Sequence, residues 1–246
     1  MHNWIFLKTT QVINVSSSST ILPRLEIRMT KKTEAPTDRV RLRRNHERAG
    51  YDADAIYPIL DAMPMCSVGY VFNGHPYVTS TLHWRDGDHI YWHGSSASQM
   101  LRATQEADVC INVSIIDGFV MARSGFNHST NYRSVMMFGK AHKVTDPDEK
   151  EASLKTFVDG LFPGRWDTLR APDTQEMKAT TVLTMPISEA SAKARKGPPV
   201  DDEDDYNLPV WGGVIPVKFQ FMEPESDGRN LDGVSIPDHV RDFKFG

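Results

Sequence analysis

The chain has 246 residues, of which 39% are hydrophobic and 24% charged, with a formal net charge of −4. This balance predicts one large folded domain with tails, and it does not favour binding to nucleic acid. The two cysteines, Cys66 and Cys110, lie far apart, which argues against a disulfide framework or a cysteine-rich zinc site. We therefore expect reduced thiols in a cytoplasmic protein, and no apolar run reaches the roughly 20 residues that span a bilayer.

The N-terminal segment, residues 1–33, has a serine cluster and few acidic residues. These features occur in transit peptides as well as in disordered polar extensions. We interpret residues 1–33 as a disordered N-terminal extension and expect the folded domain to cover residues 34–222. Residues 223–246 are rich in Pro, Gly and Asp without clear periodicity, which predicts an irregular C-terminal tail.

The first predicted elements are a helix and three strands. "DADAIYPILDAM", from Asp52, has the apolar spacing of a short amphipathic helix, with Asp52 or Asp54 as its cap. The strands "CSVGYVF", "YVTSTLHW" and "HIYWH" follow, separated by the turn signals "NGHP" and "RDGD". Tight turns between successive strands predict an antiparallel meander.

The middle of the chain continues with a helix of about three turns in "SASQMLRATQEA". The strands "VCINVSII" and "FVMARSG" are separated by a predicted Asp-Gly turn, and "RSVMMFGKAHKVT" reads as one long strand with Gly139 as a bulge or close approach. In "DPDEKEASLKTFVDGLF" we expect a helix capped by Asp146 with Pro147 at its first position.

The remaining elements are a strand or mixed segment in "EMKATTVLTMPIS", a polar loop over residues 193–209 and a last strand in "WGGVIPVKF". The acidic run of the loop is either solvated or a divalent-cation ligand. At least six strands in hairpin order with only a few helices predict a mainly β fold, a small antiparallel barrel with flanking helices.

Candidate ligand-binding residues occur in three segments. "HGSSAS" at residues 93–98 ends a strand with a glycine and serines before a helix, a pattern that suits a phosphate or a plain helix cap. Arg133 suits a phosphate or a surface ion pair, and Trp211 beside Gly212 suits a planar ligand or the core. His83, His93 and His128 lack the usual spacing of metal ligands, so we expect no metal centre.

With these segments the chain resembles the flavin-binding split-barrel proteins related to pyridoxamine 5'-phosphate oxidase, in particular the branch with nitroimidazole-resistance proteins. The resemblance runs from about Tyr51 to about Val217. It rests on "GHPYVTSTLHWRDGDHIYWHGSSASQMLR", "ARSGFNHSTNYRSVMMFGKAHKVTD", "PGRW", "SAKARKGPP" and "LPVWGGVIP" in the family's order. It implies a six-stranded antiparallel split β-barrel, a homodimer, and FMN at the interface between the two copies.

The resemblance also implies positions for the cofactor-binding residues. The strand segment from Val78 to Leu82 would run along the isoalloxazine ring, the turn from His93 to Ser98 would receive the phosphate, Arg133 and Ser134 would complete these contacts, and Trp211 would lie near the flavin. The implied residues are Val78, Thr79, Ser80, Thr81, Leu82, His93, Gly94, Ser95, Ser98, Arg133, Ser134 and Trp211.

Two departures from the family pattern bear on function. Gln99 and Met100 stand where the oxidase has an Arg-Lys pair, so Arg102 or Arg133 is needed for that charge. The C-terminal Arg-His signature of the oxidase is not evident in "PDHVRDFKFG". We therefore expect an FMN-dependent oxidoreductase that is not the oxidase itself, acts on a small molecule by hydride transfer through flavin N5, and takes electrons from a donor such as NAD(P)H. The alternative is a non-catalytic module that binds flavin or haem.

Overall fold

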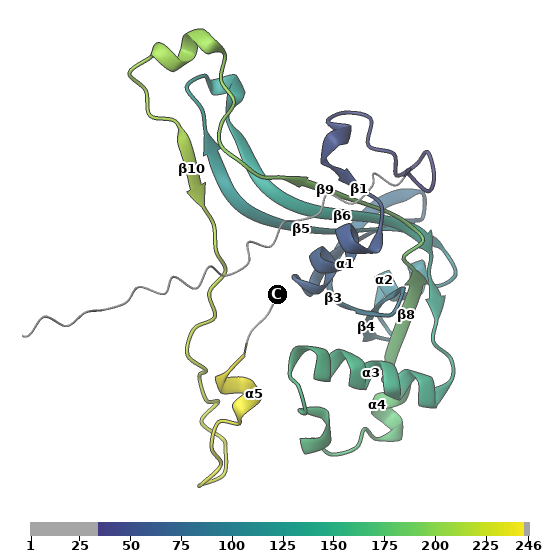
Figure 1. The fold of residues 1–246 in the computed structure, drawn as a ribbon. Helices are drawn as coiled ribbons and strands as arrows, with labels where there is room; N and C mark the ends of the chain where they lie inside the picture. The colour runs from purple at the N-terminus through teal and green to yellow at the C-terminus, as the bar shows by residue number, and fades with distance from the viewer. Residues whose placement is uncertain (1–33, 244–246) are drawn as a thin grey trace, which may run out of the picture. The chain divides into compact units, whose positions relative to one another are not determined.

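The computed structural model describes residues 34–243 (Figure 1). The predicted extension, residues 1–33, and the last three residues of the predicted tail lie outside the described residues. The described residues all belong to one unit of the chain. No helix among them is long and apolar enough to cross a membrane.

Within residues 34–243, ten strands form one sheet in the order β1-β9-β6-β5-β2-β3-β4-β8-β7, and β10 pairs with β5 beside this path. All the pairs are antiparallel. The strands are β1 (Ala49–Gly50), β2 (Met65–Phe72), β3 (His75–Asp86), β4 (His89–Ser95), β5 (Asp108–Met121), β6 (Ser129–Lys140), β7 (His142–Lys143), β8 (Thr180–Pro186), β9 (Glu189–Arg195) and β10 (Gly213–Pro216).

The helices lie between these strands and in the C-terminal segment. The α-helices are α1 (Ala53–Asp61), α2 (Gln99–Thr104), α3 (Pro147–Leu161), α4 (Thr174–Ala179) and α5 (Asp238–Arg241). Short 3-10 helices are η1 (His46–Arg48), η2 (Gly125–Asn127), η3 (Trp166–Thr168) and η4 (Glu203–Asn207).

Helix ends follow the local capping signals where those signals are strong. The Asp52 carboxylate accepts a hydrogen bond from the Ala55 N–H and caps α1. The Asp146 carboxylate accepts from two N–H groups at the start of α3, and Pro147 occupies its first position, so both predicted starts are confirmed. Helix α2 is shorter than predicted, because the backbone leaves helical geometry at Gln105 and Glu106 takes a left-handed conformation with φ of 58°.

Two sequence predictions in the sheet are wrong. The Asp-Gly pair at residues 117–118 is a register irregularity inside the continuous strand β5, because β6 pairs with β5 on both sides of it. Strand β9 extends to Arg195, so its last three residues lie in the segment 193–209 that we expected to be a polar loop. Its small residues pair along β6, where Ala190 and Ala192 are buried, so tertiary packing makes a strand of a weak β sequence.

The mainly β split-barrel fold class is confirmed, although the sheet has ten strands and not six. Strands β6 and β7 are consecutive and are separated only by Ala141, whose N–H and C=O pair with Ala107 and Glu106. Since β6 pairs with β5 and β7 pairs with β8, the path β5-β2-β3-β4-β8 closes into a ring of six strand positions. Strands β1, β9 and β10 add to this ring, which explains the larger count.

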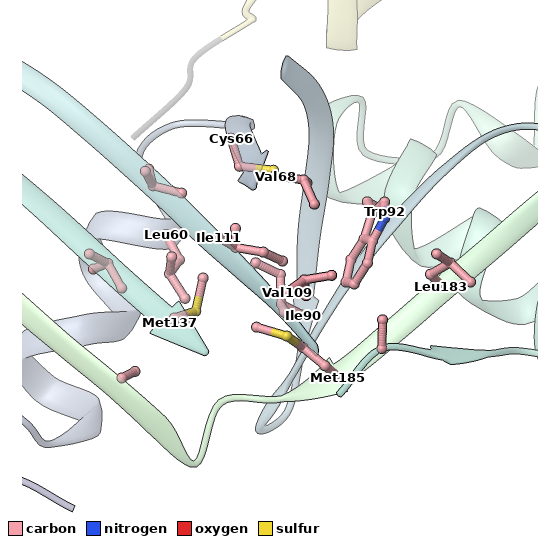
Figure 2. Packing of buried hydrophobic residues seen from close by; sticks show 14 of the residues in the cluster. Leu60, Cys66, Val68, Ile90, Trp92, Val109, Ile111, Met137, Leu183 and Met185 are labelled. Atoms are coloured by element: carbon pink, nitrogen blue, oxygen red, sulfur yellow. The ribbon is translucent and has the colours of Figure 1, made fainter. Parts of the chain in front are cut away.

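The main core lies inside this ring (Figure 2). Trp92, Ile90 and Val68 are fully buried there, together with the aliphatic side chains of β5 and β8. Alternation along β4 buries Ile90 and Trp92 in this core and leaves Tyr91 and His93 on the other face. That second face packs against α3 through a smaller cluster of Trp84, Val144 and Val182.

Candidate functional site

Strand β3 changes its pairing partner between Leu82 and His83. From His75 to Leu82 it pairs with β2, and from His83 to Asp86 it pairs with β4. In the described part of the chain, no strand pairs with the other edge of residues 75–82. Alternate residues of that segment therefore present backbone N–H and C=O groups along an open edge.

Strand β4 diverges from β3 at the same point. Its last pair with β3 is Trp92 opposite His83, whereas its pairing with β8 continues to Ser95 opposite Thr180. Leu82 and His93 are the next residues on either side and stand where the two strands separate. The structure thus brings two predicted groups, residues 78–82 and residues 93–98, to the two sides of one opening, which we call the β3–β4 split.

The turn at residues 93–98 has the features of an anion-binding strand-to-helix connection. Ser98 is the N-cap residue of α2, but its side chain makes no capping hydrogen bond. The Ser95 hydroxyl accepts from the Ala97 N–H at 3.2 Å, and Gly94 packs so closely that a Cβ would lie 3.1 Å from Leu101 Cδ1. The first N–H groups of α2 are therefore not capped by Ser98 and remain suited to an oxygen ligand.

The His93 ring contacts two aromatic side chains at the split. Its ring centroid is 4.9 Å from that of Phe157 and 5.7 Å from that of Trp84. Its Nδ1 atom is buried without a hydrogen-bond partner among residues 34–243, and burial lowers the pKa of the ring. The imidazole is therefore mainly neutral near pH 7.

His83 is more deeply enclosed, with only 3% of the residue exposed. Burial lowers its pKa to about 4, although the backbone carbonyls of Leu60 and Pro64 act in the opposite direction. The Nδ1 atom of His83 also has no partner in the described part of the chain. His83 lines a cavity of about 290 Å³ together with Leu60 of α1, Pro64 just before β2, and Phe157 and Leu161 of α3.

Arg133 and Ser134 lie away from the split within one chain. They belong to β6, which is separated from β3 by β5 and β2, so about 14 Å of sheet lies between them. The Arg133 guanidinium forms two 2.9 Å hydrogen bonds with the Asp117 carboxylate. The Ser134 hydroxyl donates to the carbonyl of Lys193 at 3.3 Å.

Trp211 is also remote within one chain. It precedes β10, whose first residue Gly213 pairs with Met121 at the far end of β5. The β5 stretch from Asn112, where β2 pairs, to Met121 spans about 30 Å. Trp211 is 66% exposed, and its ring lies over Gly213, where a Cβ would come within 2.6 Å of it.

Sequence reasoning missed Asp117, because Asp-Gly reads as a turn and its ion pair depends on β6 pairing across the irregularity. The contact between the Phe157 and His93 rings was also not predicted from the sequence, because α3 is distant in sequence from β4. His128 lies at the other end of the β5–β6 hairpin, where its Nδ1 is 2.9 Å from the Ser124 carbonyl oxygen. Among residues 34–243, no group of three or more His, Cys, Asp or Glu side chains is arranged to hold a metal ion.

The strand order and the β3–β4 split define a mainly β protein of the split-barrel class. A family model described as pyridoxamine 5'-phosphate oxidase matches residues 52–194, more than half of the chain. The chain therefore belongs to the pyridoxamine 5'-phosphate oxidase-like family.

Two solved structures are similar over most of the chain. The flavocytochrome Anf3 from Azotobacter vinelandii has a TM-score of 0.84 at 47% sequence identity, with 87% of this chain and 100% of that chain covered. The FAD and heme binding protein from Mycobacterium smegmatis has a TM-score of 0.77 at 32% identity, with coverage of 80% and 98%. A search of the curated proteins found no match.

Proposed function

We propose that this protein binds a flavin at the β3–β4 split and acts as a flavin-dependent oxidoreductase on a small molecule. The observation that carries the proposal is the open edge of β3 opposite a turn whose helix start is not capped by its serine. Such an edge offers backbone donors and acceptors to a planar heterocycle, and the turn offers N–H and hydroxyl groups to a phosphate. A bound flavin supplies hydride or electron transfer at its N5 atom.

Different residues of the β3–β4 split contact different parts of the flavin. Backbone groups of Val78–Leu82 hold the polar edge of the ring system, while Ser95, Ser98 and the N–H groups at the start of α2 hold the phosphate. His93 stands between these groups, and its lowered pKa makes it a proton acceptor near neutral pH.

A second copy of the chain completes the proposed site. Arg133, Ser134 and Trp211 lie too far from the split to reach the same ligand within one chain, as the sheet order and register indicate. Exposed apolar side chains support an interface with another copy where they lie side by side, as those of Phe119 and its directly paired neighbour Ile215 do. They include Met65, Val78, Phe119, Phe126, Trp211 and Ile215.

The form of the flavin is part of the proposal. The family resemblance predicts FMN. The relative from Mycobacterium smegmatis is described as binding FAD, and its similarity over 80% of this chain favours FAD here. Chromatography of the flavin released by heat distinguishes the two.

A second function, haem binding, is favoured by His83. A neutral imidazole with an unpartnered nitrogen is the form that ligates iron, and His83 meets both conditions beside a cavity. Of the two similar structures, one is a flavocytochrome and the other an FAD and heme binding protein. When bound, haem would supply one-electron transfer, and His83 would be the residue that holds it.

The absorbance spectrum of the purified protein tests both functions. Flavin bands with released FMN or FAD would support the flavin site, and a Soret band would support haem. Ser98→Ala should weaken flavin affinity about tenfold without loss of stability, because the Ser98 hydroxyl makes no capping hydrogen bond to α2 in the described part of the chain. The exposed Ser188→Ala is the matched control. A protein that remains colourless with added flavin and haem would contradict both functions.

For haem, His83→Ala should abolish the Soret band, whereas His128→Ala should leave it unchanged. Unfolding curves of both variants establish whether a loss of haem is a loss of fold. Equal haem content in the wild type and in folded His83→Ala would contradict the role of His83.

A further inference from the structure

A cationic pocket lies beside the split, on the other side of the end of β8. It has a cavity volume of about 540 Å³ and is lined by Lys143 of β7, Lys150 of α3 and Lys178 of α4. Three threonines, Thr145, Thr174 and Thr180, add hydroxyl-bearing residues to its wall. None of the described residues that line it carries a carboxylate. We call it the lysine pocket.

The side chain of Lys150 is held in the lysine pocket by hydrogen bonds to the backbone. Its Nζ donates hydrogen bonds to the backbone carbonyls of Met177 and Thr180, which ties α3 to the junction of α4 and β8. An ammonium group has three N–H donors, so one remains after these two bonds. Burial and the nearby positive charge of Lys143 both lower the pKa of Lys150, an effect that a bound anion would reverse.

Lys143 and Lys178 are exposed, and neither forms an ion pair within residues 34–243. Three carboxylates that lie close to these lysines in sequence have other partners. Asp146 caps α3, while Asp173 and Glu176 form the capping box of α4. Glu176 is also paired with Arg170. The positive charge of the pocket is thus not neutralised by these neighbours.

The lysine pocket adjoins the turn of the split. Thr180 of its wall pairs directly with Ser95, and the Ser96 N–H donates to the Ala179 carbonyl at 2.7 Å. Side chains of directly paired residues lie on the same face of an antiparallel sheet. The turn and the start of α2, residues 94–101, contain no lysine or arginine. A ligand with two phosphoryl groups could therefore contact the uncharged turn and the lysine pocket together.

We propose that the lysine pocket binds a diphosphate group. Three lysines and three threonines suit an anion with several charges and many acceptor oxygens, and the cavity is larger than a single phosphate requires. The diphosphate has two possible sources. It belongs to FAD held at the split, in which case the inference rests on the proposed function, or to a free pyridine nucleotide that binds next to the flavin.

Titration calorimetry with inorganic pyrophosphate tests the pocket. The double variant Lys143→Gln/Lys178→Gln should bind pyrophosphate at least tenfold more weakly than the wild type. Lys218→Gln, an exposed lysine outside the pocket, should bind within twofold of the wild type. Both variants leave the Lys150 contacts intact, so the fold should be retained, and circular dichroism checks this. Absence of binding by the wild type, or equal binding by the double variant, would overturn the proposal.

Protein loaded with FMN and protein loaded with FAD distinguish the two sources of the diphosphate group. If the diphosphate belongs to FAD, pyrophosphate should bind protein loaded with FMN but not protein loaded with FAD. If it belongs to a free nucleotide, both forms should bind pyrophosphate, and NADPH should compete. Pyrophosphate binding by a protein that retains no flavin would support the lysine pocket and contradict the proposed function, so the two can fail separately.

Discussion

Arg133 and Asp117 form a two-point ion pair across β5 and β6, with Nε–Oδ2 and Nη2–Oδ1 distances of 2.9 Å. The register irregularity of β5 between Ile116 and Gly118 places the carboxylate there. The backbone carbonyl of Asp117 accepts a hydrogen bond from the Val217 N–H, which joins the segment after β10 to this ion pair. An arginine held in this way is oriented but keeps part of its surface free, since its side chain is 40% exposed.

This pair makes the role of Arg133 testable. If Arg133 contacts a flavin phosphate, Arg133→Ala should raise the flavin dissociation constant about tenfold or more, as expected for a charge-assisted bond. Asp117→Asn should leave that constant unchanged or lower it, because the guanidinium stays in place. Both variants should lose at most about 1 kcal/mol of stability, because the pair is half exposed. Equal weakening of flavin binding by both would show a purely structural pair.

Gly118 next to this pair should not tolerate a side chain. A Cβ would lie 3.0 Å from the Ile215 carbonyl oxygen and from Val214 Cγ1, so the backbone of β10 would have to move. We expect Gly118→Ala to reduce the free energy of unfolding by about 1–3 kcal/mol in urea denaturation. Gly160→Ala is the matched control. It lies within α3 with no atom within 4 Å of its Cβ position, and it should stabilise the protein by about 0.5–1 kcal/mol.

The sequence predicted those parts of the fold that depend on neighbouring residues. The starts of α1 and α3 follow from Asp52, Asp146 and Pro147, whose effects act within one helical turn. The hairpin turn at Asn73 and Gly74 follows from left-handed backbone angles that few residues adopt, with φ of 51° and 79°. The family resemblance then supplied the split-barrel fold class.

The features that were not predicted from the sequence depend on contacts between segments that are distant in the chain. Asp117 and Gly118 read as a turn, yet β6 and β10 pair along both edges of β5 and keep that strand continuous. The open edge of β3 follows from the partner change at His83, which no local pattern encodes. The lysine pocket likewise draws Lys143, Lys150 and Lys178 from three elements.

The buried His83 should make stability depend on pH in protein free of haem. Its pKa is about 4 in the folded chain against 6.5 for an unperturbed histidine. The unfolded chain therefore takes up a proton between these values while the folded chain does not. Stability from His83 is fully present above about pH 6.5 and is lost as pH falls toward 4, by about 3 kcal/mol in all.

Urea unfolding between pH 7 and pH 4.5 measures this loss. The pKa of His93 is lowered in the same direction, so His83→Gln should flatten the pH dependence without abolishing it. The pKa values of Glu176 and Glu189 are also lowered, but these carboxylates act mainly below pH 4.5. His128→Gln, at an exposed position, should keep the wild-type slope. An unchanged slope in folded His83→Gln would contradict the assignment.

Trp211 should contribute to the flavin site of the other copy in a dimer. Within its own chain it is about 30 Å along β5 from the level of β2, and it is largely exposed. Trp211→Ala should therefore change stability by less than about 0.5 kcal/mol while it weakens flavin binding. Wild-type flavin affinity in this variant would exclude Trp211 from the site.

Mixed dimers test whether the Ser98 and Trp211 of one flavin site come from the same chain or from two different chains. In a dimer of one Ser98→Ala chain and one Trp211→Ala chain, a shared site leaves one of the two sites with both native residues. If each site belonged to a single chain, both sites would carry a substitution. We expect mixed dimers, co-expressed with two affinity tags, to bind flavin with wild-type affinity at half of their sites, whereas each variant alone binds weakly. Weak binding at both sites of the mixed dimer would place Trp211 in the site of its own chain and contradict the shared arrangement.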